Sequence, residues 1–461
     1  MADNIDKALD LGGKPELEIL KKETEVVVDG QRVPAPEGLE IEMDEDGGAT
    51  LDFDPREALP EIEFYSNLAE VIDDRDLAEL SDELMGDFES DKSSRKEWED
   101  AYIKGLGLLG IKYEERTNPF RGASSATHPL LAESATQFQA TAFKELLPAG
   151  GPVRTVIMGD ETPEKYARAG RVQEFMNFQL MNKMEDYTPE YDQMLFYLPL
   201  AGSTFKKVYY DELMERPVSK FVPAEDLVVN YLSTDLDNCE RICHVINMSY
   251  NDFRKKQVSG FYKDVDILPQ EAEENDVQKK YNELQGTKPS YADKVVRLYE
   301  FHTSIDLKDF EDKDDSGEMT GIKIPYIVTV EEGSSQVVGI RRNYEKDDPK
   351  KMKKQYFVQY KFLPGLGFYG FGLIHLIGGL SRTATDILRQ LLDAGTLSNL
   401  PAGFKSRGIR MRDDADPLQP GEFRDIDAPN GDLRNSFMPL PYKEPSQTLY
   451  SLLGFVVQAG Q

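Results

Sequence analysis

The sequence predicts an α+β fold in which a mixed α/β body carries two long helices with a small α/β insert between them. Three observations support this prediction. Apolar residues recur every three or four positions between 373 and 391, which is the spacing of one helix face. A second pattern of this kind follows Pro445 and runs to the end of the chain. Between residues 203 and 361, short runs rich in β-branched and aromatic residues predict strands.

Residues 1–62 are predicted to form an acidic N-terminal arm. They contain few large apolar side chains, and the stretch 37–54 gathers many carboxylates around Gly47 and Gly48. Such a composition favours a solvated arm with little fixed structure. The alternative is an arm that packs on a neighbouring subunit. The first 13 residues are polar and charged, unlike a signal peptide.

Residues 63–370 are predicted to form one mixed α/β body. Its expected helices are 68–89, 95–106, 128–146, 163–184, 249–258 and 271–284. Strands are expected over 153–158, 203–210 and 227–231. Four further strands are expected to form a meander, namely 295–305, 321–330, 337–342 and 355–361.

The first long helix is predicted to span residues 371–396. Gly395 is expected to end it, because glycine commonly occupies the position just after a helix. Its apolar face is expected to be a packed helix face that contributes to assembly with other copies. The residues predicted to make this packing are Leu380, Ala384, Ile387, Leu388 and Leu391.

The insert is predicted to span residues 397–442 and the second long helix residues 443–461. A hairpin-like stretch in the insert, 423–437, is expected to turn at Asn430-Gly431, a strong two-residue turn signal. Pro445 suits the first turn of the second helix. The apolar pattern of that helix still runs at the last residue, so we expect the helix to continue beyond the given sequence.

The composition limits the classes of partner. The formal net charge of −30, from 84 acidic and 54 basic residues, has the wrong sign for a protein that grips nucleic acid by its phosphates. The two cysteines, Cys239 and Cys243, lack the second pair that a zinc site needs. No run of 18 uninterrupted apolar residues occurs, so no membrane span is expected.

No catalytic set can be assembled from the sequence. The four histidines are far apart, and neither a nucleophile elbow nor a P-loop is present. Residues 365–370 match the G-x-G-x-x-G pattern of dinucleotide-binding loops, but Pro364 interrupts the strand before them. Phe368 and Tyr369 are also bulky where phosphates would approach. We therefore predict a glycine-aromatic joint, no enzyme activity, and no cofactor or metal.

Several long stretches carry a family resemblance. They are 113–159, 202–211, 259–262, 368–380, 388–397, 399–404 and 443–446. Together they resemble the portal proteins of tailed bacteriophages, the head-to-tail connectors, and most closely the large portals of short-tailed phages. The resemblance implies a portal fold, with 63–370 as the wing, 371–396 and 443–461 as stem helices, and 397–442 as the clip.

The resemblance also implies a function. Portal proteins form a ring of twelve subunits at one capsid vertex, and double-stranded DNA passes through the ring without sequence specificity during packaging and ejection. The expected partners are the terminase large subunit, a tail adaptor or head completion protein, and the major capsid and scaffolding proteins. The expected location is the virion after assembly in the host cytoplasm, with no membrane. A non-viral acidic protein that oligomerises as a scaffold is the alternative, and it leaves the helix–insert–helix resemblance without an explanation.

Two sets of cations are candidate contact residues. In the clip, Lys405, Arg407, Arg410 and Arg412 are either ordinary surface charges or docking residues for terminase and adaptor. In the first stem helix, Arg382 and Arg389 either pair with the aspartates four positions later, Asp386 and Asp393, or face the channel. The sequence leaves these alternatives open.

Overall fold

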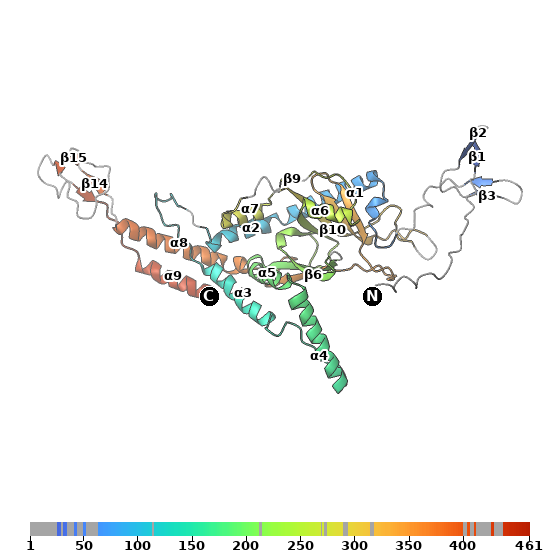
Figure 1. Ribbon diagram of the computed structural model, residues 1–461. Coiled ribbons are helices and arrows are strands. Elements are labelled where there is room, and N and C mark those ends of the chain that lie inside the picture. The colour runs from blue at the N-terminus through green and yellow to red at the C-terminus, as the bar shows by residue number, and fades with distance from the viewer. Residues whose placement is uncertain are drawn as a thin grey trace, which may run out of the picture. The chain divides into compact units, whose positions relative to one another are not determined.

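The chain divides into two compact units, Met1–Phe64 and Tyr65–Gln461. The computed structural model describes residues 63–399 and 437–461, except for 113–114, 212–213, 269, 272–273, 289–293 and 314–317. Outside these ranges it describes only the short strands β1 to β4 and β14 to β16 (Figure 1).

The first unit contains two short antiparallel hairpins. They are formed by β1 (Glu25–Val28) with β2 (Gln31–Pro34), and by β3 (Ile41–Met43) with β4 (Ala49–Leu51). We predicted little fixed structure for residues 1–62, so these hairpins are a difference. The other residues of that arm lie outside the described part of the chain.

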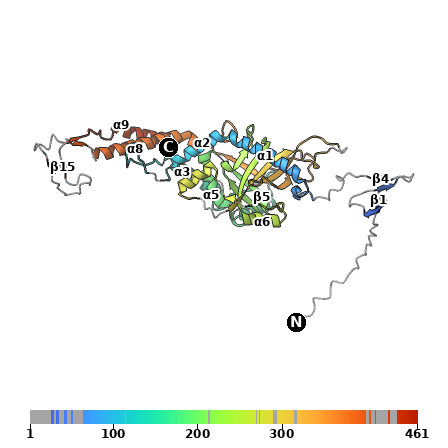
Figure 2. The ribbon, with the colours of Figure 1, turned by 90° about the horizontal axis from the view of Figure 1, so that it is seen from above.

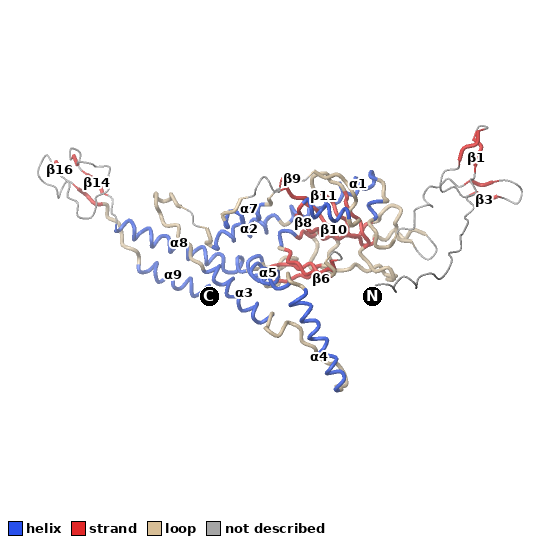
Figure 3. Tube along the Cα trace, in the orientation of Figure 1, coloured by secondary structure: helices blue, strands red, loops and turns tan. Residues whose placement is uncertain are grey.

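The second unit is an α+β structure with two antiparallel sheets (Figure 3). Its strands are β5 (Ser203–Asp211), β6 (Arg216–Val222), β7 (Leu227–Val229), β8 (Arg241–Ser249), β9 (Gln270–Glu271), β10 (Lys294–Ile305), β11 (Ile324–Glu331), β12 (Val337–Arg342) and β13 (Phe357–Lys361). The larger sheet has the order β12-β11-β10-β8-β7, with β9 paired to β10. The smaller sheet has the order β13-β5-β6.

The predicted meander is right for three strands and wrong for the fourth. Strands β10, β11 and β12 are consecutive antiparallel neighbours, as expected. Strand β13 instead pairs with β5, with Phe357 opposite Lys207 and Lys361 opposite Ser203. Burial explains the change of sheet, because Phe357 lies in the core between the two sheets and is 1% exposed.

Nine α-helices occur in the described part of the chain. They are α1 (Asp74–Ser94), α2 (Lys96–Leu106), α3 (Leu130–Leu146), α4 (Pro163–Phe178), α5 (Tyr187–Ala201), α6 (Tyr250–Val258), α7 (Asp276–Gln285), α8 (Leu373–Asn399) and α9 (Gln447–Gly460). A π-helical turn, Gln179–Lys183, continues α4. Helices α8 and α9 lie side by side and antiparallel in both views (Figures 1 and 2).

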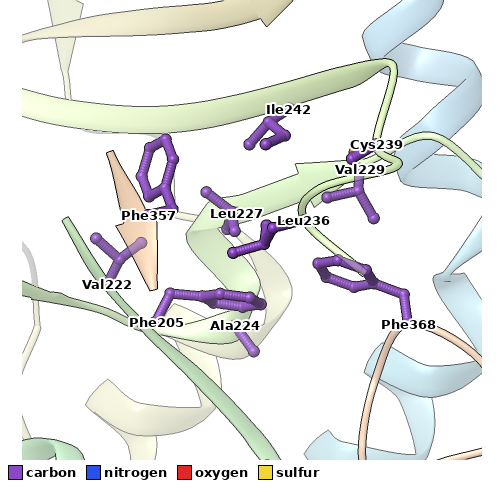
Figure 4. Packing of buried hydrophobic residues seen from close by; sticks show 10 residues of the cluster. All are labelled: Phe205, Val222, Ala224, Leu227, Val229, Leu236, Cys239, Ile242, Phe357 and Phe368. Atoms are coloured by element: carbon purple, nitrogen blue, oxygen red, sulfur yellow. The ribbon is translucent and has the colours of Figure 1, made fainter. Parts of the chain in front are cut away.

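The central core lies between the two sheets. Phe205 of β5 and Phe357 of β13 face Leu227 of β7 and Ile242 of β8 across it (Figure 4). Phe368, from the loop that precedes α8, stacks on Phe205 with ring centroids 5.8 Å apart. The loop that leads into α8 is therefore part of this core.

Four parts of the body differ from the sequence-based expectation. Residues 153–158 form no strand; instead, the backbone amides of Val153 and Thr155 donate to the side-chain amides of Asn177 and Gln173 on α4. Strand β8, which lies between β10 and β7 in the larger sheet, and strand β6 were not predicted. Helix α5 was also not predicted, since Pro189 and Pro199 disguise its periodicity.

Candidate functional site: the helix pair and its joint with the body

Helices α8 and α9 form a pair held by a small apolar cluster. Ala384, Ile387 and Val456 are buried at its centre, and Leu380 and Leu391 pack on them with three apolar residues of α9. Ser446 caps α9, because its hydroxyl accepts a bond from the amide of Leu449. Four of the five residues predicted for a packed face of the first long helix lie in this cluster. The fifth, Leu388, is half-buried outside it.

Two details at the far end of the pair correct our predictions. Gly395 does not end the first helix, which continues to Asn399. A Cβ atom at Gly395 would lie 3.7 Å from the ring of Pro445, so a small residue is accommodated where the chain leading into α9 passes close to α8. Pro445 precedes the capping residue of α9 rather than lying in its first turn.

The polar face of α8 holds a segment of its own chain. The Asp393 carboxylate accepts a bond of 2.6 Å from the amide of Ser124, and the Thr385 hydroxyl accepts one from the amide of His128. Arg389 donates to the carbonyl of Ala126 at 2.7 Å and to the hydroxyl of Thr127. The segment 124–128 therefore lies along α8 through hydrogen bonds of its backbone.

These contacts concern the two arginines of α8 for which the sequence left alternatives open. Among the described residues, neither suggested pair, Arg382–Asp386 or Arg389–Asp393, forms an ion pair, and Arg389 and Asp393 both bind the segment 124–128. The Arg382 side chain is exposed, and among the described residues it makes no ion pair.

Three glycines form the joint between α8 and the body. The chain at Gly202, after α5, crosses the chain at Gly370 and Gly372, before α8, with backbone touching backbone. A Cβ atom at Gly372 would lie 2.4 Å from the carbonyl oxygen of Leu200 and 2.7 Å from that of Pro199. A Cβ atom at Gly202, where φ is +82°, would lie 2.4 Å from the carbonyl oxygen of Gly370.

The last glycine of the G-x-G-x-x-G loop and the two residues after it use their backbone amides within this joint. The amide of Gly370 donates to the hydroxyl of Ser203 at 2.7 Å, and the amide of Gly372 donates to the His375 ring at 3.1 Å. The amide of Phe371 donates to the carbonyl of Leu363. These are the donors that a phosphate would need. The geometry thus favours the predicted joint over a dinucleotide site.

Arg95, at the start of α2, ties the same loop to the body. Its Nη1 donates to the carbonyls of Ala224 and Leu227 and to the Tyr369 hydroxyl at 2.9, 2.7 and 3.0 Å, and its Nη2 pairs with Glu99 at 2.8 Å. Trp98 stacks on Tyr369 with ring centroids 4.7 Å apart. We did not predict this role for Arg95, because its partners at residues 224, 227 and 369 come from distant parts of the sequence.

A cavity of about 50 Å³ adjoins Arg95 and is lined by acidic and basic side chains, including Glu225, Asp226 and Arg297. Burial, with the adjacent Asp226 charge, raises the pKa of Glu225 to about 7. Burial likewise raises the pKa of Asp226 to about 6. The two carboxyls therefore take up their charges close to neutral pH, inside the body rather than at its surface.

Lys206 on β5 is a second buried charge. It is 2% exposed, and its ammonium lies 4.7 and 4.5 Å from the ring centroids of Tyr187 and Tyr191 on α5. Burial lowers the pKa of Lys206 to about 8. The two ring faces offset part of the cost of burying this cation.

The insert between the helices is described only through its strands. Strand β14 (Gly403–Lys405) pairs with β17 (Phe437–Pro439), and β15 (Arg410–Met411) pairs with β16 (Ile426–Asp427). The strands thus pair in a nested order, and β16 does not pair within 423–437 as the predicted hairpin requires. Arg407 and Arg412 lie outside the described residues, as do the side chains of Lys405 and Arg410.

Large apolar side chains are exposed at several places on the second unit, and two of these places are the helix pair and α4 with the chain before it. On the helix pair they are Leu376, Leu392, Tyr450, Leu452 and Phe455. On α4 and the chain before it they are Val156, Met158, Tyr166, Val172, Phe175, Met176, Phe178 and Met181. Exposure of this extent is typical of surfaces that another molecule covers. The sequence predicted helix 163–184 but not that its apolar residues face outward.

The described residues contain neither a metal-binding cluster nor a membrane-spanning helix. Among the described residues, no group of three or more His, Cys, Asp or Glu is placed to hold a metal ion. Within that same part of the chain, no helix has the length and apolar character needed to cross a bilayer. No protein-family model matches the chain, and no curated protein matches it significantly.

Proposed function

We propose that this chain is the subunit of a phage portal, a ring of twelve copies at one capsid vertex through which DNA enters and leaves. The observation that carries the proposal is the antiparallel pair α8–α9, which encloses an insert with nested strand pairs. This order of elements is what the resemblance of residues 368–404 and 443–446 implies for a stem and clip. A portal fold of wing, stem and clip belongs to the same proposal.

The exposed apolar residues on the helix pair support assembly into a ring. Tyr450 and Phe455 of α9 are 65% and 68% exposed, although they belong to an apolar helix. Leaving such side chains in water costs about 25 cal/mol for each Å² of apolar surface. Contact with the helix pairs of neighbouring copies would remove that cost.

The charge supports a channel that does not hold DNA tightly. Twelve copies at −30 each carry a formal charge near −360. A predominantly negative wall repels phosphates, so DNA slides through without sequence-specific binding. In this proposal, Arg382 is a candidate channel residue because it is exposed and unpaired among the described residues, whereas Arg389 holds its own chain.

The remaining partners belong to the same proposal. The clip, with Lys405, Arg407, Arg410 and Arg412, would bind the terminase large subunit during packaging and then a tail adaptor or head completion protein. Capsid and scaffolding proteins would surround the ring in the virion. The proposal assigns no reaction, cofactor or metal to this chain, and the ATP-driven motor is another protein.

Native mass spectrometry with negative-stain images of the same sample tests this function. We expect rings of twelve or thirteen copies with an axial hole wide enough for duplex DNA, since portals made alone can miscount. Oligomers without such a hole would favour the alternative, a non-viral acidic scaffold. Monomers at all concentrations would contradict the portal proposal for this chain.

A further inference from the structure

Helix α4 and its π-helical continuation, Pro163–Lys183, form a projecting element that we call the α4 arm. The helix α4 contains no buried residue, unlike the other α-helices in the described part of the chain. In Figure 1 it extends away from the two sheets. Phe175 is 61% exposed and Tyr166 is 55% exposed, so large aromatic side chains lie in water along it.

The contacts that the arm makes with its own chain are mainly polar. Asn177 accepts a bond from the amide of Val153 at 2.9 Å and donates to its carbonyl at 3.1 Å. Gln173, one turn earlier, accepts from the amide of Thr155. These positions recur every four residues with Ala169, whose carbonyl accepts from the Thr155 hydroxyl, and so define one face of the helix.

The opposite face of the arm combines apolar and basic side chains. By helical periodicity, that face carries Arg168, Arg171, Val172, Phe175 and Phe178, together with one acidic residue, Glu164, and all six are exposed. No hydrogen bond or ion pair of the described chain involves either arginine. The side chains that could bind a partner are therefore not used within this chain.

The charge of the arm is opposite to that of the chain. Residues 163–183 contain four basic residues, Lys165, Arg168, Arg171 and Lys183, and two acidic residues, Glu164 and Glu174, for a net charge of +2. The whole chain carries −30. A surface with basic and aromatic side chains is thus complementary to the acidic surface of another copy, and attraction there lessens the repulsion between two chains of the same charge.

We propose that the α4 arm docks on the acidic surface of the next copy of this chain. Because the arm carries a net positive charge and the rest of the chain a net negative charge, the contact is head-to-tail, and it closes a ring where the rotation between successive copies returns to the first copy. This inference rests on the proposed function and adds a second contact between neighbours, separate from the helix pairs. The arm supplies aromatic anchors at the centre of the contact and arginines around them.

Charge reversal on the full chain tests the docking. The variant R168E/R171E changes the formal charge by −4 on the outer face of the arm. The control K346E/K350E makes the same change at two exposed lysines of the loop before β13 that form no ion pair in the described residues. Both variants should unfold at the urea concentration of the unchanged chain, since all four side chains are exposed and unpaired.

We expect the arm variant to raise the protein concentration needed for half-assembly by about tenfold or more, while the control changes it far less. Native mass spectrometry across a dilution series measures this concentration. Equal assembly of the two variants would overturn the proposal. If the arm binds a different virion protein instead, the arm variant assembles as the control does, which is the same negative outcome.

A cross-link identifies what the arm touches. Cys239 and Cys243 are 3% and 2% exposed, so V172C, which leaves the aromatic anchors in place, introduces the one accessible thiol among the described residues, to which a benzophenone is attached. Peptides cross-linked from a second, isotope-labelled copy support the docking; cross-links within one copy alone, or none, refute it. Cross-linked copies that form no ring with an axial hole would refute the portal function while supporting the arm contact.

Discussion

Replacing Gly372 by alanine places a methyl group where two stretches of backbone already meet. The new Cβ atom would lie 2.4 Å from the carbonyl oxygen of Leu200 and 2.8 Å from the amide nitrogen of Gly202, whereas ordinary contacts are 3.4–4 Å. One of the two stretches must therefore move by about 1 Å, and neither contact is with a side chain that could rotate away. Overpacking of this kind costs about 3 kcal/mol, or more where backbone hydrogen bonds are also lost.

The same loop offers a matched control at Gly367. A Cβ atom there would meet nothing within 4 Å. Alanine at this position should leave the free energy of unfolding unchanged or raise it by about 0.5 kcal/mol, because it restricts the unfolded chain. Gly379, inside α8, gives a third comparison. A Cβ atom there would also meet nothing within 4 Å, so G379A should stabilise the helix by about 1 kcal/mol.

Urea unfolding followed by tryptophan fluorescence measures these differences. Trp98 is the only tryptophan and stacks on Tyr369 of the joint, so its emission reports the joint directly. We expect G372A to shift the emission of the native protein and to lower the unfolding midpoint, with G367A unchanged. Equal midpoints and equal native emission for G372A and G367A would refute the account of the joint.

Three further predictions concern the buried charges and the helix pair. E225Q should raise the free energy of unfolding by about 3 kcal/mol at pH 8 but by about 1 kcal/mol at pH 5.5. The reason is that the pKa of Glu225 in the folded state, about 7, lies above its unfolded value, so the cost of burying the charge grows as the pH rises between the two values. Denaturation curves that show the same gain at both pH values would contradict this prediction. Lys206→Met should stabilise the protein by about 1 kcal/mol at pH 7. Burial of the ammonium costs about 3 kcal/mol, and its contact with the faces of the two tyrosine rings offsets about 2 kcal/mol of this. A loss of stability in urea titrations would show that the rings stabilise the ammonium by more than that. Leu391→Asp should destabilise the α8–α9 pair by about 3 kcal/mol and accelerate amide hydrogen exchange in α9. The control Leu392→Asp, at the exposed neighbouring position, should leave hydrogen exchange within the isolated chain unchanged. Similar exchange rates in the two variants would argue against this packing face.

Local patterns predicted the long elements of this chain well. The periodicity of Leu380, Ala384, Ile387 and Leu391 identified the face of α8 that packs on α9, because that face is buried by a neighbour close in sequence. The same pattern could not reveal that Gly395 continues the helix. Whether a glycine ends a helix or lies within it depends on what passes nearby, which here is Pro445.

Contacts between distant segments were beyond prediction from the pattern alone. Arg95 binds carbonyls of residues 224–227 and the hydroxyl of Tyr369, and no local signal distinguishes it from a surface arginine. Gly202 carries a partial signal, since it follows a helix that ends in apolar residues. Its contact with Gly370 becomes evident only when strands β5 and β13 are paired.

The direct contact between the backbones at Gly202 and Gly372 fixes the direction in which α8 leaves the body. The helix has 27 residues, and at about 1.5 Å each its length is about 40 Å. A rotation of about 5° at the near end would displace the far end by about 3.5 Å, roughly the diameter of a carbon atom. A contact made by side chains would permit such a rotation, because side chains can change rotamer. Carbonyl oxygens and amides in direct contact do not permit it. The direction of α8 is thus controlled by the absence of three side chains at its base.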